Sequence, residues 1–252
     1  AFHLVINQML LVYKILMTYL KKIVYIYLQY LIIKKLMKKI SLKICGITNL
    51  RSVEMAYKNK IKSLGFASNN LSGPNTVNDK MIKKLIKECN YYKIESVLLT
   101  KNYSLNEIIK QIDFTKPKTI SCSYHFNKDE LSQIKKIFKK IRIGISINPE
   151  NFNKKYIESV KKIIDVIYFD MNVYKQKKIK KYSLKKSLKQ IEFIKNKKIP
   201  IYIGGGIDKK NAAKIIRETK PNGLDVSRSL KNNRNLISKL KLKDFLNQIS
   251  VG

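Results

Sequence analysis

The chain has 252 residues, a formal net charge of +36, 44% hydrophobic residues and 10% aromatic residues. This apolar content is enough for a sizeable core, and it excludes an intrinsically disordered chain. The cysteines, Cys45, Cys89 and Cys122, form no CxxC motif, and there are only two histidines. A disulfide framework, a structural zinc site and a poly-histidine metal centre are therefore excluded, and a reducing, cytoplasmic compartment is favoured.

Lysine supplies almost all of the positive charge, with 48 lysines against five arginines. Isoleucine (38) and asparagine (22) are also abundant, and these residues share AT-rich codons, so a base-composition bias accounts for the charge. Nucleic-acid readers favour arginine, whose planar guanidinium reads guanine and stacks on bases. Nucleic acid is therefore not an expected partner, whereas a basic surface still attracts anionic substrates.

Residues 1–40 differ from the rest, because they carry seven lysines and no acidic residue. Lys14, Lys21 and Lys22 interrupt the apolar runs, which stay shorter than the roughly 18–20 residues of a membrane-spanning helix. We predict a basic, apolar and helical N-terminal extension over residues 1–40, followed by a domain over 41–252. Met37 opens a segment typical of the start of a compact domain. The preferred hypothesis gives residues 1–36 no defined role, and the alternative is membrane contact through an interfacial helix.

From residue 41 onward, short apolar runs alternate with lysine-rich runs of helical periodicity. Asn78 is expected to cap the second helix, whose inward face is expected to carry Met81, Ile82, Leu85 and Ile86. The predicted strands cover 41–46, 63–67, 95–100, 118–124, 142–147, 165–170, 199–204 and 223–227. The predicted helices cover about 50–60, 78–89, 105–112, 128–139, 151–162, 183–197, 208–219 and 236–249. Eight such repeats predict an α/β fold, a single (β/α)8 TIM barrel with a parallel sheet covered by helices.

A barrel of this kind builds its active site at the C-terminal ends of its strands, with phosphate commonly bound after strands 7 and 8. The loop after the seventh predicted strand contains Gly204, Gly205 and Gly206, whose backbone can approach an anion closely. The loop after the eighth contains Ser227 and Arg228. We predict a substrate phosphate site formed by Gly205, Gly206, Ser227 and Arg228. The alternative for the glycines is a tight turn before the next helix.

Four segments in these strands carry a resemblance to a known family. They read KICGIT at 43–48, LGF at 64–66, IGGGIDKKNAAKII at 203–216 and GLDVSRS at 223–229. In order and spacing they resemble phosphoribosylanthranilate isomerases, barrel enzymes of tryptophan biosynthesis, over about residues 41–249. The first motif is fairly specific, and the last two are shared in kind with other phosphate-binding barrels.

The resemblance implies an Amadori rearrangement that converts N-(5-phosphoribosyl)anthranilate to 1-(2-carboxyphenylamino)-1-deoxyribulose 5-phosphate. It also implies that neither a metal nor another cofactor is needed. By the same resemblance, Cys45 is the catalytic base and Asp170 the catalytic acid. A thiol with an ordinary pKa near about 8.5 needs only a modest shift to act as a base. An aspartate acts as an acid when burial or a nearby anion raises its pKa.

Other segments depart from the family pattern. Many members have an arginine after the second strand, where this chain reads SGPNTV, and many read QLHG where this chain reads SCSYHF. His125 falls near the latter position and is expected to contact the substrate; the alternative is a solvated loop histidine. The expected partner is a small phosphosugar, and the expected state is a monomer or homodimer. The alternative function is a degenerate phosphate-binding barrel that binds nucleic acid or anionic membrane through its lysine-rich surface.

Overall fold

The computed structural model describes residues 13, 16–28, 40–73, 75–171 and 182–251. The chain divides into two compact units, Ala1–Ile40 and Ser41–Gly252. In the first unit, residues 16–28 form a helix whose side chains are all exposed, inside the segment for which the sequence predicts helix. A search of the described residues finds no helix with the length and hydropathy to cross a membrane.

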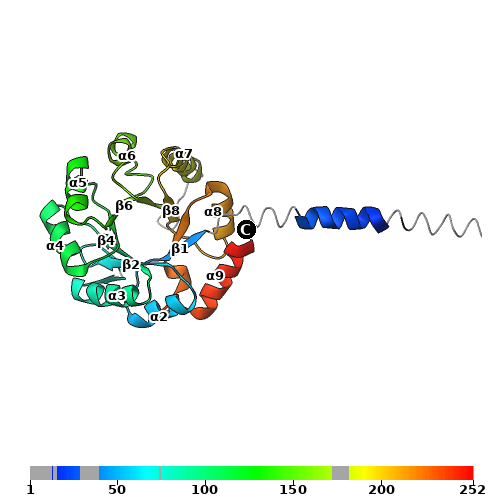
Figure 1. Ribbon diagram of the computed structural model, residues 1–252, viewed down its shortest axis with the longest axis horizontal. Coiled ribbons are helices and arrows are strands. Elements are labelled where there is room, and N and C mark those ends of the chain that lie inside the picture. Colours follow the sequence, from blue (N-terminus) through cyan, green and yellow to red (C-terminus); the bar gives the residue numbers. More distant parts are fainter. Residues whose placement is uncertain (1–12, 14–15, 29–39, 74, 172–181, 252) are drawn as a thin grey trace, which may run out of the picture. The chain divides into compact units, whose positions relative to one another are not determined.

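The second unit is a closed barrel of eight parallel strands, which confirms the predicted TIM barrel (Figure 1). β1 pairs with β2 on one side and with β9 on the other, which closes the ring. A two-residue strand, β3 (Thr76–Val77), is added beside β2. The barrel strands are β1 (Ser41–Ile44), β2 (Ser63–Ser68), β4 (Glu95–Thr100), β5 (Thr119–Cys122), β6 (Arg142–Ile147), β7 (Val166–Asp170), β8 (Ile201–Gly204) and β9 (Gly223–Val226).

A ring of helices surrounds the strands, as Figure 1 shows. They are α2 (Leu50–Lys58), α3 (Asp79–Tyr91), α4 (Leu105–Thr115), α5 (Lys128–Ile137), α6 (Lys154–Val160), α7 (Tyr182–Asn196), α8 (Ala212–Thr219) and α9 (Lys239–Val251). A 3-10 turn, η1 (Arg228–Leu230), follows β9. Each helix carries the chain back to the end of the barrel at which the strands begin. The C-terminal ends of all eight parallel strands therefore lie at one rim.

Local signals in the sequence explain several helix starts. The Asn78 side chain accepts a hydrogen bond from the Met81 backbone N–H at 2.9 Å, which confirms the predicted cap of α3. A capping box between Ser104 and Glu107 begins α4. Ile82, Leu85 and Ile86 are buried as predicted. The prediction was wrong for Met81, which is 37% exposed because it lies at the edge of the inward face.

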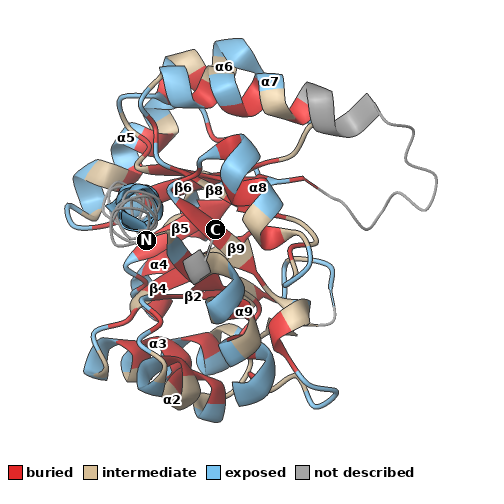
Figure 2. Ribbon diagram, turned by 90° about the vertical axis from the view of Figure 1, so that its right-hand side faces the viewer, coloured by how far each residue is buried: buried red, intermediate tan, exposed pale blue. Residues whose placement is uncertain are grey.

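The buried residues form the strands and the inward faces of the helices, while the outer helix faces are exposed (Figure 2). Inside the barrel, Val97 on β4 and Val166 and Tyr168 on β7 form one buried cluster. Gly144 on β6 makes room for the Tyr168 ring, because a Cβ at that glycine would lie 2.7 Å from ring atom Cε2. The interior of the barrel is therefore filled below the rim, and chemistry is confined to the rim itself.

Several strand and helix boundaries near the rim differ from the prediction. The predicted strand 118–124 ends at Cys122, so the following residues form a loop. The helix predicted from Asp208 begins at Ala212. The Asp208 carboxylate accepts hydrogen bonds from the backbone N–H groups of Lys210 and Asn211 at 2.8 and 3.1 Å, and these bonds stabilise a turn ahead of the helix.

Candidate active site

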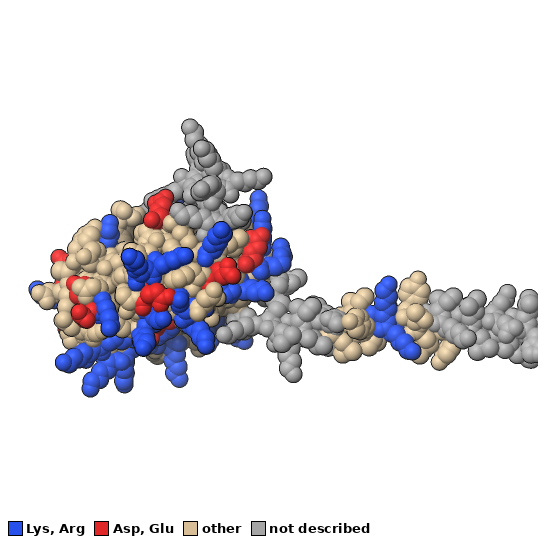
Figure 3. All heavy atoms as spheres, turned by 90° about the horizontal axis from the view of Figure 1, so that it is seen from above, with Lys and Arg blue, Asp and Glu red and all other residues tan. Residues whose placement is uncertain are grey.

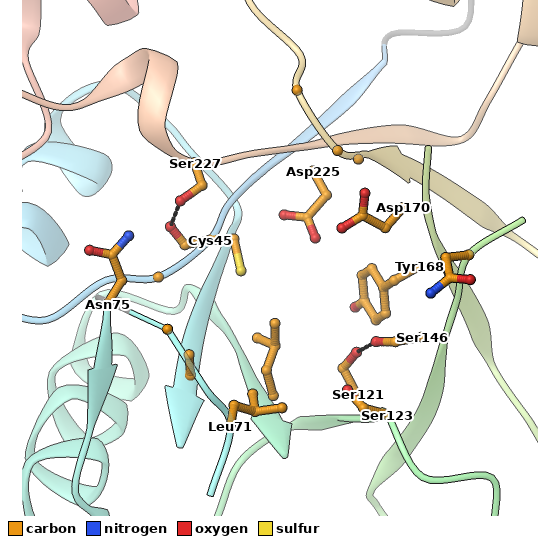
Figure 4. A pocket seen from close by; sticks show the side chains of 18 of the residues that line it. Cys45, Leu71, Asn75, Ser121, Ser123, Ser146, Tyr168, Asp170, Asp225 and Ser227 are labelled. Atoms are coloured by element: carbon orange, nitrogen blue, oxygen red, sulfur yellow. Dashed lines mark hydrogen bonds between the residues drawn. The ribbon is translucent and has the colours of Figure 1, made fainter. Parts of the chain in front are cut away.

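A cavity of about 750 Å³ opens at the C-terminal ends of the strands. Its walls come from the C-terminal ends of the barrel strands and from the described loops after β1, β2, β5, β6, β8 and β9, and Figure 4 shows the side chains that point into it. A volume of this size suits a phosphosugar carrying one aromatic ring. The structure brings together six of the predicted site residues in its lining, namely Cys45, Asp170, Gly205, Gly206, Ser227 and Arg228.

Cys45 follows β1 and is held by a hydrogen bond from its backbone N–H to the Val226 carbonyl at 2.8 Å. Its sulfur lies against Gly65 on β2, where an added Cβ would approach Sγ to 3.0 Å. Burial raises the pKa of the Cys45 thiol above its ordinary value. Lys43 and Lys231 act in the opposite direction, because nearby positive charge favours the thiolate.

Asp170 is the last residue of β7 and pairs with Gly204 at the end of β8. Its side chain points into the cavity that the Cys45 thiol also faces (Figure 4). β8 and β9 lie between the strands that carry these two residues. A carboxyl group and a thiol therefore reach the same space from separate strands, as acid–base catalysis on one bound molecule requires.

A buried ion pair, which the sequence analysis missed, lies beside the thiol. The Lys43 Nζ atom is 2.6 Å from Asp225 Oδ2 and 4.5 Å from the centre of the Tyr168 ring. Burial alone would lower the pKa of Lys43, but the charge of Asp225 raises it above its usual value. The other carboxylate oxygen of Asp225, Oδ1, is buried without a hydrogen-bond partner among the described residues.

Strand alternation was the signal that could have found this pair. Side chains two apart on a strand share a face, so Lys43 points to the same side of β1 as Cys45. The register pairs Lys43 with Asp225 on the neighbouring strand β9. Two opposite charges at matching inward positions of adjacent buried strands predict an ion pair inside the barrel.

The two loops expected to bind phosphate both reach the cavity. Gly205 and Gly206 have φ angles of 84° and 89°, in the region that glycine adopts without strain. The Ser227 hydroxyl donates to the Cys45 carbonyl at 3.0 Å, and the Ser229 hydroxyl donates to the Ile207 carbonyl at 2.7 Å. These bonds tie the loops to each other and to β1, and they direct both hydroxyl protons at carbonyl groups.

His125 is not among the residues that line the cavity. Its ring stacks on Tyr156 with 4.7 Å between centroids, and its Nε2 lies 3.2 Å from the Ser146 carbonyl oxygen. The Tyr156 hydroxyl in turn donates to the Phe126 carbonyl at 2.8 Å. The structure therefore places His125 against Tyr156 and outside the cavity lining, apart from the other predicted site residues.

The rest of the cavity wall combines uncharged polar residues with apolar ones such as Leu71, Leu99 and Ile147. The Ser121 and Ser146 hydroxyls lie 2.8 Å apart (Figure 4), and Ser123, Asn148 and Asn151 lie nearby in the lining. Among the described residues, Arg228 is the cationic residue of the cavity wall. The lysine-rich segment 172–181 lies outside the described residues. A search of the described residues finds no group of three or more His, Cys, Asp or Glu arranged to hold a metal ion.

Comparison with known proteins gives this arrangement a family. The model of the N-(5'-phosphoribosyl)anthranilate (PRA) isomerase family matches residues 42–248. No curated protein matches the chain. The N-(5'-phosphoribosyl)anthranilate isomerase of Pyrococcus furiosus is 18% identical, with a TM-score of 0.65 over 83% of this chain and 98% of that one. The phosphoribosyl anthranilate isomerase of Thermococcus kodakaraensis is 17% identical, with a TM-score of 0.68 over 84% and 99%.

A third structure is that of a phosphoribosyl anthranilate isomerase in complex with reduced 1-(o-carboxyphenylamino)-1-deoxyribulose 5-phosphate. It is 15% identical, with a TM-score of 0.60 over 83% of this chain and 98% of that one. At these identities the structures establish the shared barrel, whereas the family match covers its sequence from the first strand to the last helix. The chain therefore belongs to the N-(5'-phosphoribosyl)anthranilate isomerase family.

Proposed function

We propose that Cys45 and Asp170 carry out the isomerisation of N-(5-phosphoribosyl)anthranilate as base and acid. Family membership assigns the reaction itself, and the chain is an isomerase of tryptophan biosynthesis. The observation that supports the two roles is the shared cavity, into which both side chains point beside the glycine loop.

The reaction needs one proton donor and one proton acceptor. Asp170 donates a proton to the ring oxygen of the ribose as the C1–O bond breaks, which leaves an open chain with a protonated C1–N double bond. The Cys45 thiolate then removes the proton from C2, and the electron pair forms an enolamine. Protonation at C1 and loss of the proton of the C2 hydroxyl give the aminoketose. Each positioned group of this kind typically supplies about 10²–10⁴-fold.

The phosphate fixes the substrate relative to these two groups. In this proposal, the phosphate is bound by the backbone N–H groups of Gly205 and Gly206 and by the guanidinium of Arg228. The backbone of Ser227 contributes a further contact to the phosphate. The sugar then extends across the cavity between Cys45 and Asp170. The anthranilate end lies over the uncharged part of the wall, where hydroxyl and amide groups are available for its carboxylate.

The decisive variant is Cys45→Ser, which replaces the thiol by a hydroxyl that hardly ionises near neutral pH. We expect turnover to fall by about 10²–10⁴-fold, measured by the loss of substrate fluorescence, with binding of a product analogue retained. Cys89→Ser is the matched control, because Cys89 is buried in α3 away from the cavity, and it should keep full turnover. Full turnover in Cys45→Ser would remove Cys45 from the mechanism.

We further propose a cytoplasmic enzyme that works as a monomer or homodimer. The three cysteines are free in the structure, as a reducing compartment requires. Lysine and arginine side chains are scattered among other residues on the face shown in Figure 3 and do not follow a single stripe. This distribution favours steering of small anions over nucleic-acid binding. A barrel with no isomerase activity and a steep salt-dependent affinity for nucleic acid or anionic vesicles would contradict the proposal.

A further inference from the structure

Lys231 lies directly behind the turn that carries Cys45. It follows η1 and is only 4% exposed. Its Nζ atom donates a hydrogen bond to the Gly46 carbonyl. Its own backbone is fixed on two sides, by a bridge to Ile237 and by a hydrogen bond of 2.7 Å from the Lys241 ammonium to the Lys231 carbonyl. The ammonium of Lys231 is therefore held in place beside the β1 turn.

The turn itself is shaped to receive this ammonium. Gly46 has a φ of +66°, and a Cβ there would lie 3.1 Å from Asn75 Cβ, 3.2 Å from Lys231 Nζ and 3.4 Å from Ser227 Oγ. The Ser227 hydroxyl donates to the carbonyl of Cys45, and Lys231 donates to the next carbonyl. Two side chains that follow β9 thus hold two successive peptide groups at the thiol.

The described residues place two positive charges, Lys43 and Lys231, and one negative charge, Asp225, near Cys45. The thiol faces Lys43 and Asp225 inside the barrel and Lys231 behind the turn. Lys43 and Asp225 form an ion pair at 2.6 Å, so each largely offsets the effect of the other on the thiol. Lys231 forms no ion pair with an Asp or Glu of the described residues. Burial of an unpaired ammonium is costly, and lysines are rarely buried without a partner.

We propose that Lys231 is a positioning residue for Cys45: it fixes the Cys45–Gly46 turn and supplies the unpaired positive charge that stabilises the thiolate. This inference rests on the proposed role of Cys45 as the base. Lys231 would then form with Cys45 a thiol–amine pair that loses a single proton when the base is generated. Removal of the ammonium should make the thiolate harder to form without disturbing the phosphate loops.

The electrostatic consequence has a definite sign. Burial lowers the pKa of Lys231 to about 8, and the nearby Cys45 acts in the opposite direction. Because the two groups interact, this proton loss belongs to the pair. Without Lys231, the raised pKa of the buried thiol is no longer countered from this side, so the base should form only at higher pH.

The test measures the thiol directly. In a Cys89→Ser/Cys122→Ser background, the rate of Cys45 alkylation by iodoacetamide is followed against pH. Burial raises the pKa of both of these other thiols to about 12, so their removal loses no reactive group. We expect Lys231→Met to move the alkylation profile to higher pH by at least one unit, which lowers the rate at pH 7 about tenfold. The pH profile of kcat/KM should move in the same direction.

Lys241→Met is the matched control. It removes a lysine that holds the same backbone segment, through the hydrogen bond to the Lys231 carbonyl, but it leaves the Lys231 ammonium in place. This control should keep the wild-type alkylation profile. Lys231→Arg, which preserves the charge, should show an alkylation profile close to that of the wild type. Equal shifts in Lys231→Met and Lys241→Met would reduce Lys231 to a packing role and overturn the proposal.

An unchanged alkylation profile in Lys231→Met would also overturn the proposal. If circular dichroism shows that the methionine variant does not fold, Lys231→Gln is measured as the second neutral variant, with the same expected shift. The alkylation readout does not depend on turnover. Activity retained in Cys45→Ser would therefore contradict the proposed function, whereas the effect of Lys231 on the thiol would still be decided by the alkylation profiles.

Discussion

The two sides of the cavity differ in their chemistry. One side, which we call the catalytic side for the proposed roles of Cys45 and Asp170, is formed by the C-terminal ends of β1, β7, β8 and β9 with the loops after β1, β8 and β9. It holds a thiol, two carboxylates, adjacent glycines and Arg228. The hydroxyl side, formed by the loops after β5 and β6, holds Ser121, Ser123 and Ser146 with two asparagines. Ionisable side chains and the glycine loop are therefore concentrated on one side, and neutral hydroxyl and amide groups occupy the other.

The same division runs through the sequence. Three of the segments that resemble the isomerase family, 43–48, 203–216 and 223–229, lie on the catalytic side. The SCSYHF segment that departs from the family contributes Ser121 and Ser123 to the hydroxyl side. We therefore expect the chemistry to follow the family closely and recognition of the anthranilate end to depend on residues particular to this chain.

The largest effect that would sharpen this contrast is expected from Asp170→Asn on the catalytic side. The amide keeps the shape of the carboxyl group but cannot donate the acidic proton, so turnover should fall by about 10²–10⁴-fold with little loss of product-analogue binding. Ser146→Ala on the hydroxyl side is the matched comparison, and it should change turnover by less than about tenfold. Steady-state kinetics of both variants check this, and similar losses of turnover would break the contrast.

A large loss of stability is expected from Lys43→Met, which leaves the Asp225 carboxylate buried without its partner. Removing one member of a buried ion pair typically costs about 3–5 kcal/mol. Urea unfolding should therefore show a reduced free energy of unfolding. The double variant Lys43→Met/Asp225→Leu should recover much of it, since no charge then stays buried. A single variant as stable as the wild type would mean that the pair contributes nothing to the fold.

The sequence predicted the fold because the signals were local and repeated. Each strand is a short apolar run, and caps such as Asn78 and Ser104 mark helix starts. The catalytic side was accessible for the same reason, since Cys45, Asp170 and the glycines stand at strand ends. The ion pair and Lys231 were missed, because both depend on contacts between residues more than 180 positions apart. His125 lies outside the cavity lining, because the strand before it ends at Cys122 and its ring stacks on Tyr156.

A moderate effect is expected from Arg228→Ala. If the guanidinium binds the phosphate, its loss removes a charge-assisted hydrogen bond of about 1.5–3 kcal/mol, and KM should rise by about 10- to 100-fold while kcat changes little. Arg234→Ala is the control, because Arg234 is exposed and does not line the cavity. An unchanged KM in Arg228→Ala would leave the glycine loop as the main phosphate ligand on the catalytic side.

The smallest effect is expected from removal of residues 1–36, so that the chain starts at Met37. The barrel begins at Ser41, the family match begins at residue 42, and the described residues that line the cavity all lie from Cys45 onward. We expect kcat/KM to stay within about twofold and the Tm within a few degrees, because surface changes away from a core or site seldom matter more. Sedimentation with anionic vesicles tests the alternative role, and binding by the full chain that the truncated chain lacks would assign residues 1–36 to a membrane surface. A truncated chain that cannot fold or isomerise would make the extension part of the catalytic domain. The comparison of the two sides of the cavity would then have to include residues 1–36.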